Sequence, residues 1–308
     1  MPAAFLINHG AHGYGKFVYD EATLKTFQTK LGRLESSLDR KQAYLFMYDM
    51  IKSKRIAASR VLAIILGNVE SEAAEDILQE LFKSLVPTLV GKYLPIEDYE
   101  STTRSLFELS LKMLASGRYT APSTKELLVD QAISFSNGPS LELVLKWFMT
   151  DKVTDPSGKE VTGLELSLKR KHQMVEKIFT SRTISAEQKR DAFAKLQTLD
   201  QTDTIEKTRK FCEAATPSLE AKKQVWDSLM EMKEDPGVTA IIAYGRGLRQ
   251  LTQLDILDKF ADAFFEKIEA VVATQGQGTA DKVYMFLQPN LRADEKDIAR
   301  YNKFLAKL

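Results

Sequence analysis

The residues best suited to chemistry stand near the N-terminus, where glycines, histidines and a lysine are closely spaced. Gly10, Gly15 and Lys16 match most of a phosphate-binding loop, in which backbone amides and a lysine hold a nucleotide. Position 17 is Phe rather than the Ser or Thr that would hold magnesium. In addition, Phe17-Val18-Tyr19 favours extended backbone where such a loop should open a helix. We therefore interpret the segment as a structural glycine turn.

The three histidines could ligate a metal, but their spacing does not specify a site. His9 and His12 are three residues apart in a glycine-rich turn, which does not align two imidazoles as a helix would. His172 follows the basic residues Lys169-Arg170-Lys171, and the His-Glu-x-x-His signature of zinc peptidases is absent. We expect no catalytic residue, no metal ligand and no cofactor-binding residue in this chain.

Three further features are weaker candidates for chemistry. Cys212 has no histidine nearby in the sequence, so we expect a small core or groove residue. Gly245-Arg246-Gly247 resembles part of a dinucleotide fingerprint, but position 250 is Gln rather than Gly. The run Lys169, Arg170, Lys171 and His172 is typical of a solvated helix face, and it is also a candidate contact for a peptide carboxylate or a protein partner.

Composition limits the class of protein. The chain has 308 residues, of which 44% are hydrophobic and 28% charged, as in a folded domain. The 43 basic and 42 acidic residues leave a net charge of +1, which gives no electrostatic case for a nucleic-acid partner. A single cysteine favours a reducing compartment, and we expect the cytoplasm. No apolar run approaches the roughly 18 residues that a membrane span requires.

Hydrophobic periodicity predicts helices over nearly the whole chain. Apolar residues recur three and four positions apart in 78–89, 107–114, 128–135 and 257–271. Ser123 with Glu126, Ser185 with Gln188, and Asp203 with Glu206 have the spacing of capping boxes that begin helices. Only 4–8 and 16–19 look extended. We expect an all-α fold, an irregular HEAT-like superhelix of antiparallel helix pairs, with a short extended segment at the N-terminus.

Two boundaries divide this organisation. Residues 1–20 form a junction segment with a glycine-rich turn and short strands, and residues 21–308 form the helical domain. The polar stretch 150–163 contains Asp155-Pro156-Ser157-Gly158, a turn sequence that stops helix propagation. We expect a sub-boundary there.

Two segments resemble a known family. Residues 5–20 resemble the junction that starts the C-terminal helical domain of gluzincin-type zinc aminopeptidases, with Ile7 where Pro is common and Lys16 in place of Arg. Asp203-Thr204 and then 214–226, an alanine-rich stretch ending in Pro217 and Trp226, resemble a second motif of the same family. The group includes aminopeptidase N, puromycin-sensitive aminopeptidase and the endoplasmic-reticulum aminopeptidases. The resemblance extends from about residue 4 to about residue 289.

The resemblance implies a domain that encloses substrate without catalysing its cleavage. In the family the zinc site lies in a preceding thermolysin-like domain, so zinc is expected only there. The helical domain closes over that catalytic domain, limits substrate size and can bind the distal part of a peptide. The resemblance assigns a junction turn, formed by Asn8, Gly13, Tyr14, Gly15 and Lys16, that packs against the preceding domain.

An alternative is a stand-alone, noncatalytic helical scaffold that binds a protein or peptide on its concave face. Met1 lies just before the family's junction motif, which favours a fragment of a longer enzyme over a natural start. The partner we expect is the preceding catalytic domain of the same enzyme, or else a protein or peptide.

Overall fold

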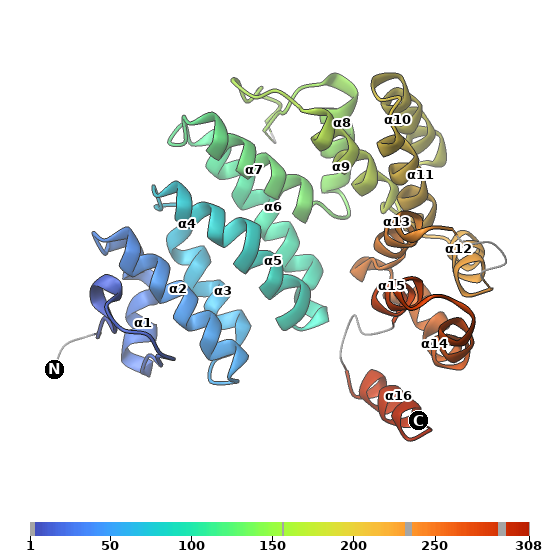
Figure 1. The fold of residues 1–308 in the computed structure, drawn as a ribbon. Helices are drawn as coiled ribbons and strands as arrows, with labels where there is room; N and C mark the ends of the chain where they lie inside the picture. The colour runs from blue at the N-terminus through green and yellow to red at the C-terminus, as the bar shows by residue number, and fades with distance from the viewer. Residues whose placement is uncertain (1–3, 156, 232–235, 289–293, 308) are drawn as a thin grey trace. The chain divides into compact units, whose positions relative to one another are not determined.

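The computed structural model describes residues 4–155, 157–231, 236–288 and 294–307. Helices dominate these residues, which contain no β-strand and a single isolated antiparallel bridge, between Thr154 and Glu160 (Figure 1). The predicted all-α fold class is therefore confirmed. The HEAT-like superhelical arrangement stays a prediction.

The chain forms two compact units. The first unit contains Met1–Tyr99 and Lys112–Gln131, and the second contains Glu100–Leu111 and Ala132–Leu308. The helices α6 (Tyr99–Ala115) and α7 (Pro122–Phe135) contribute residues to both units. The 150–163 stretch lies inside the second unit, between two of its helices, and the predicted domain boundaries stay predictions.

The first unit begins with a short 3₁₀ turn and continues as packed helices. Its elements before α6 are η1 (His9–Ala11), α1 (Glu21–Lys30), η2 (Leu31–Arg33), α2 (Ser37–Lys52), α3 (Ala58–Val69), α4 (Glu75–Glu80), η3 (Leu81–Leu85), α5 (Val86–Thr88), η4 (Leu89–Tyr93) and η5 (Ile96–Asp98). From α4 to η4 the helix is continuous, but η3 and η4 are π-helical. Pro87 lies in this run, and a proline has no N–H to bond the carbonyl four residues earlier. A π-helical segment is a known way for a helix to absorb such an interruption.

A buried ion pair in the first unit joins α2 to the loop before α4. The Arg40 guanidinium donates to both carboxylate oxygens of Glu72, at 2.8 and 2.7 Å, and also to the carbonyl of Leu34 at 2.6 Å. Glu72 also accepts the backbone amides of Ala73 and Ala74, at 3.0 and 2.9 Å. Because both charges are paired and their remaining hydrogen-bonding atoms are occupied, the unit can hold them out of water.

The second unit continues from α7 with further helices. They are α8 (Ser140–Thr150), α9 (Leu168–Phe179), α10 (Ala186–Leu199), α11 (Asp203–Ala215), α12 (Leu219–Glu231), α13 (Val238–Leu248), η6 (Leu251–Gln253), α14 (Leu254–Thr274), α15 (Gln277–Leu287) and α16 (Glu295–Leu305). The helices α8 and α9 are separated by a longer connection after Thr150. The helices α9, α11, α13 and α15 pack in succession as one row (Figure 1). The helices α10 and α12 both pack on α11, and α14 packs on α12 and α15.

One hydrophobic cluster of this unit lies between α12, α13, α14 and α15. Trp226 is 5% exposed and its ring centroid lies 5.2 Å from that of Phe260 and 6.4 Å from that of Phe264. The predicted stripe of α14 is confirmed, since Phe260, Phe264 and Ile268 are all buried in this cluster. None of the described helices combines the length and apolar character needed to cross a bilayer.

Candidate functional site

The junction turn is closed by a side chain at its first residue. Asn8 has a left-handed backbone, with φ 58°, which asparagine tolerates better than most residues. Its Oδ1 accepts the amide of Gly13 at 2.7 Å, and its Nδ2 donates to the carbonyl of Gly13 at 3.0 Å. These two bonds join Asn8 to Gly13 and so fix the path of the chain between them.

A buried carboxylate attaches this turn to α2. Asp39 is 3% exposed in the first turn of α2; its Oδ1 accepts the amide of Gly10 at 3.0 Å, and its Oδ2 lies 2.7 Å from Nδ1 of His9. Burial raises the pKa of Asp39, but bonds from Gly10, His9 and Ser36 outweigh that effect and hold the pKa below its usual value. Asp39 is therefore a charged anchor, and it is a residue that sequence reasoning missed.

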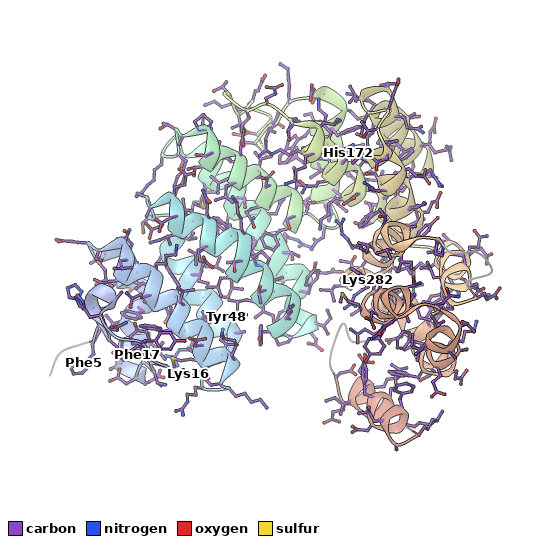
Figure 2. All side chains as sticks on the ribbon, in the orientation of Figure 1. Phe5, Lys16, Phe17, Tyr48, His172 and Lys282 are labelled. Atoms are coloured by element: carbon purple, nitrogen blue, oxygen red, sulfur yellow. The ribbon has the colours of Figure 1, made fainter. Side chains whose placement is uncertain are left out.

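The remaining junction residues face outward. The side chain of Tyr14 is fully exposed, and Gly15 and Lys16 are exposed beside it. Phe17 is held differently, because its ring lies 4.8 Å from that of Phe46 on α2. Phe5 is 57% exposed although its amide donates to Thr23 Oγ1 at 3.0 Å. In Figure 2, Phe5, Lys16 and Phe17 lie together at the N-terminal end of the first unit.

This geometry does not suit a nucleotide phosphate. The helix α1 begins only at Glu21, and the Asp20 side chain accepts the amide of Thr23 in its first turn at 2.8 Å. No helix N-terminus therefore lies directly after Lys16 to receive an anion. His9 is engaged with Asp39, and the described part of the chain brings together no group of three or more His, Cys, Asp or Glu side chains that could hold a metal.

The basic run opens α9 in the second unit, and its members have different surroundings. Arg170 and His172 are buried, and Lys171 pairs with Asp151 at 2.9 Å. Lys169 is exposed. The run is therefore not one uniform solvated face, and its role in binding stays a prediction.

His172, labelled in Figure 2, has a structural role. Its Nδ1 lies 2.7 Å from Oγ1 of Thr208, and its Nε2 lies 2.8 Å from Oδ2 of Asp200. Backbone and side-chain bonds from Thr202, and then the contact with His172, hold the pKa of Asp200 below its usual range. The imidazole thus connects α9 to α11 and to the loop before it.

Cys212 and the glycine pair Gly245 and Gly247 also contribute to packing. Cys212 is a free thiol, 2% exposed, and burial raises its pKa well above the ordinary value. A Cβ on Gly245 would lie 2.4 Å from Cβ of Phe286, and one on Gly247 would lie 2.3 Å from the carbonyl oxygen of Phe211. These two glycines therefore let α13 approach α15 and α11 closely, which accounts for the Gly-Arg-Gly sequence without a nucleotide.

These features define an all-α domain with an anchored N-terminal turn. The model of the ERAP1-like C-terminal domain family matches residues 4–308, and the chain belongs to this family. The resemblance found in the sequence is thereby confirmed. The chain is also similar to Aminopeptidase N of Streptomyces lividans, with 24% identity over 312 residues that cover 99% of this chain. The chain spans 34% of the length of that relative.

Proposed function

We propose that this chain is the substrate-enclosing, regulatory C-terminal domain of a zinc aminopeptidase and is not catalytic alone. The observation that supports this most is the family match over 4–308, together with a relative about three times as long that is named an aminopeptidase. The zinc and the catalytic residues would belong to the preceding domain. The free, buried Cys212 is compatible with a reducing compartment, and we propose the cytoplasm.

An enclosing domain acts on a reaction by limiting access. A wall of packed helices excludes bulk water, which strengthens polar contacts around a bound peptide, and it restricts the size of the substrates that enter. Within this role, Lys169 is the member of the basic run that remains exposed for a peptide carboxylate. We expect regulation to appear as selection by peptide length.

The junction turn is the surface we assign to the catalytic domain. Asp39 and Asn8 hold its backbone at Gly10 and Gly13, and the next residue, Tyr14, presents a fully exposed aromatic side chain. Aromatic residues with a polar tip are favoured at protein interfaces. Tyr14→Ala should therefore leave the stability of the isolated chain unchanged and weaken its association with a catalytic domain.

The first experiment uses the purified chain alone. Release of coumarin from leucyl-aminomethylcoumarin should stay at background, with or without added zinc. Zinc-dependent turnover that follows the chain through successive purification steps would contradict the proposal.

A chimera tests the enclosing role directly. This chain replaces the corresponding third of the Streptomyces lividans enzyme, and the catalytic segment without any helical domain serves as reference. Cleavage of the coumarin substrate checks that each form is folded. We expect the chimera to discriminate between short and long peptides more strongly than the reference does. Equal length preference in the two forms would refute a regulatory role, and an unchanged chimera carrying Tyr14→Ala would refute the assigned surface.

A further inference from the structure

A groove in the second unit lies outside the features described so far. It consists of two adjoining hollows of about 290 and 420 Å³, both open to solvent. The first is lined by α10 and α11, and the second by α11, α12 and Tyr244 of α13. Phe179 and Glu213 line both hollows, so the two form one continuous groove along α11, hereafter the α11 groove.

The first hollow has an aromatic lining. Phe179 and Phe193 meet edge to face, with ring centroids 6.2 Å apart, and both rings border the hollow. The buried Cys212 also lines it, and Val225 lines the second hollow. Covering this surface with a large apolar side chain would be favourable, because it removes apolar area from water.

The carboxylates near the groove are already neutralised. Glu213 accepts from the Arg209 guanidinium and, at 3.2 Å, from the hydroxyl of Tyr244. Glu206 accepts two bonds from Arg209, at 2.8 and 2.6 Å, and also pairs with Lys210 at 3.4 Å, so that two cations face the two carboxylates. Arg209 and then Lys210 lower the pKa of Glu206 to about 2. Burial and then the Glu213 charge raise the pKa of Tyr244 to about 12, so this hydroxyl keeps its proton.

One positively charged side chain that lines the groove has no ion-pair partner among the described residues. Arg190 lines the first hollow and is exposed, and no described side chain forms an ion pair or hydrogen bond with it. A guanidinium is a geometrically specific partner for a carboxylate, since it offers two parallel N–H donors. The groove therefore combines an apolar hollow with an adjacent, uncompensated positive charge.

We propose that the α11 groove is a docking surface for a partner polypeptide in which an acidic side chain lies next to a large apolar one. The apolar side chain occupies the hollow between Phe179 and Phe193, and the carboxylate pairs with Arg190. Both hollows are open to solvent, so an internal segment of a partner chain can reach them. This inference is independent of the enclosing role, which concerns the catalytic domain.

The test measures binding of short fluorescein-labelled peptides to the full chain by fluorescence anisotropy. The probe carries aspartate followed by phenylalanine and ends in an amide, so that the aspartate side chain is the only carboxylate of its peptide part; the dye is the same in every peptide compared. Two matched peptides replace aspartate with asparagine or phenylalanine with alanine. We expect the probe to bind with Kd below about 1 mM, and each replacement to weaken binding at least about 10-fold, as expected for a charge-assisted contact or a buried ring.

Variants of the chain locate the site. Arg190→Ala should weaken the probe about 10-fold without altering the weak binding of the asparagine peptide, whereas Arg104→Ala, at an exposed arginine elsewhere in the second unit, should change nothing. Arg190→Glu should reverse the preference toward a peptide with lysine in place of aspartate. Far-UV circular dichroism checks that each variant is folded. The proposal fails if the probe does not bind at about 1 mM or if the asparagine peptide binds as tightly as the aspartate probe. It also fails if Arg190→Glu still prefers the aspartate probe over the lysine peptide.

Discussion

Lys222 shows how a single buried side chain connects several helices of the second unit. It is fully buried, and its Nζ donates to the carbonyl of Ala214 at 2.7 Å and to that of Leu248 at 3.4 Å. These carbonyls lie at the C-terminal ends of α11 and α13, where the last carbonyls of a helix lack intrahelical partners. The amine therefore satisfies two helix ends at once, and burial, followed by the charge of Arg182, lowers its pKa to about 7.

The lowered pKa of Lys222 predicts how stability depends on pH. An unfolded lysine has a pKa of about 10.4, so between about pH 7 and pH 10 the unfolded chain binds more protons than the folded chain. The free energy of unfolding should then rise with pH through this window, by at most about 5 kcal/mol from this group. Urea unfolding at constant ionic strength at pH 7, 8 and 9 measures the slope.

Lys222→Met provides the comparison for this slope, because it removes the titrating amine and leaves other ionisations in place. We expect a flatter profile for Lys222→Met than for the parent chain. Lys223→Met is the matched control, since Lys223 is exposed and pairs with Asp227. Equal slopes for the parent chain and Lys222→Met would show that Lys222 stays charged in the folded state.

Trp226 is a second buried side chain whose contribution to stability can be measured. Its indole packs against Phe260 and Phe264 in the core of the second unit. Trp226→Ala removes this contact area and leaves a cavity, so we expect a loss of about 3–5 kcal/mol in the free energy of unfolding. Leu219→Ala, at a position on the same helix that is 41% exposed, should cost far less. Chemical unfolding followed by circular dichroism measures both, and a loss below about 1 kcal/mol for Trp226→Ala would place the indole outside the core.

At the scale of elements, the approach of α13 to its neighbours depends on Gly247. A Cβ at this position would also lie 2.8 Å from Cβ of Ala214, so alanine forces α13 away from α11. Alanine gains about 1 kcal/mol in helix propensity, but overpacking against backbone should cost about 1–3 kcal/mol, with the net effect destabilising. Gly278→Ala is the control, because nothing lies within 4 Å of its added Cβ in α15. Thermal unfolding should show a lower Tm for Gly247→Ala and an equal or higher Tm for Gly278→Ala.

The sequence predicted those helices whose capping residues and apolar spacings lie within a few residues of one another. Ser185 and Gln188 form the expected capping box at the start of α10. The box proposed at Asp203 is wrong by one residue, because Thr202 provides the cap of α11 through a bond to Thr204. Helical periodicity also located the buried stripe from α4 to η4, but the π-helical segments depend on how Pro87 is accommodated, which periodicity does not describe.

The site was less predictable because its contacts join distant residues. The junction turn was identified from Asn8 and Gly13, whose partnership is local. Its anchor, Asp39, is about thirty residues away, and only the packing of the turn on α2 brings them together. In the same way, the basic residues before His172 suggested a solvated face, whereas Asp200 and Thr208 draw the imidazole inside.

At the scale of the whole molecule, two helices connect the compact units covalently. Tyr99 and 112–115 of α6 belong to the first unit, and residues 100–111 of the same helix belong to the second. The helix α7 likewise changes unit after Gln131. Since a helix forms cooperatively, loss of structure at one end destabilises the rest. We therefore expect the two units to unfold together in one cooperative transition.

Both tryptophans of the chain, Trp147 and Trp226, lie in the second unit, whereas the Arg40–Glu72 pair lies in the first. Arg40→Ala leaves the buried Glu72 without its partner, which should cost about 3–5 kcal/mol. If the units are coupled, the urea midpoints measured by circular dichroism and by tryptophan fluorescence will fall by the same amount. Lys41→Ala should leave both midpoints nearly unchanged, because Lys41 forms only a long surface ion pair, 3.5 Å from Asp76. A fluorescence midpoint that stays at its parent value while the circular dichroism midpoint falls would mean that α6 and α7 do not transmit the loss.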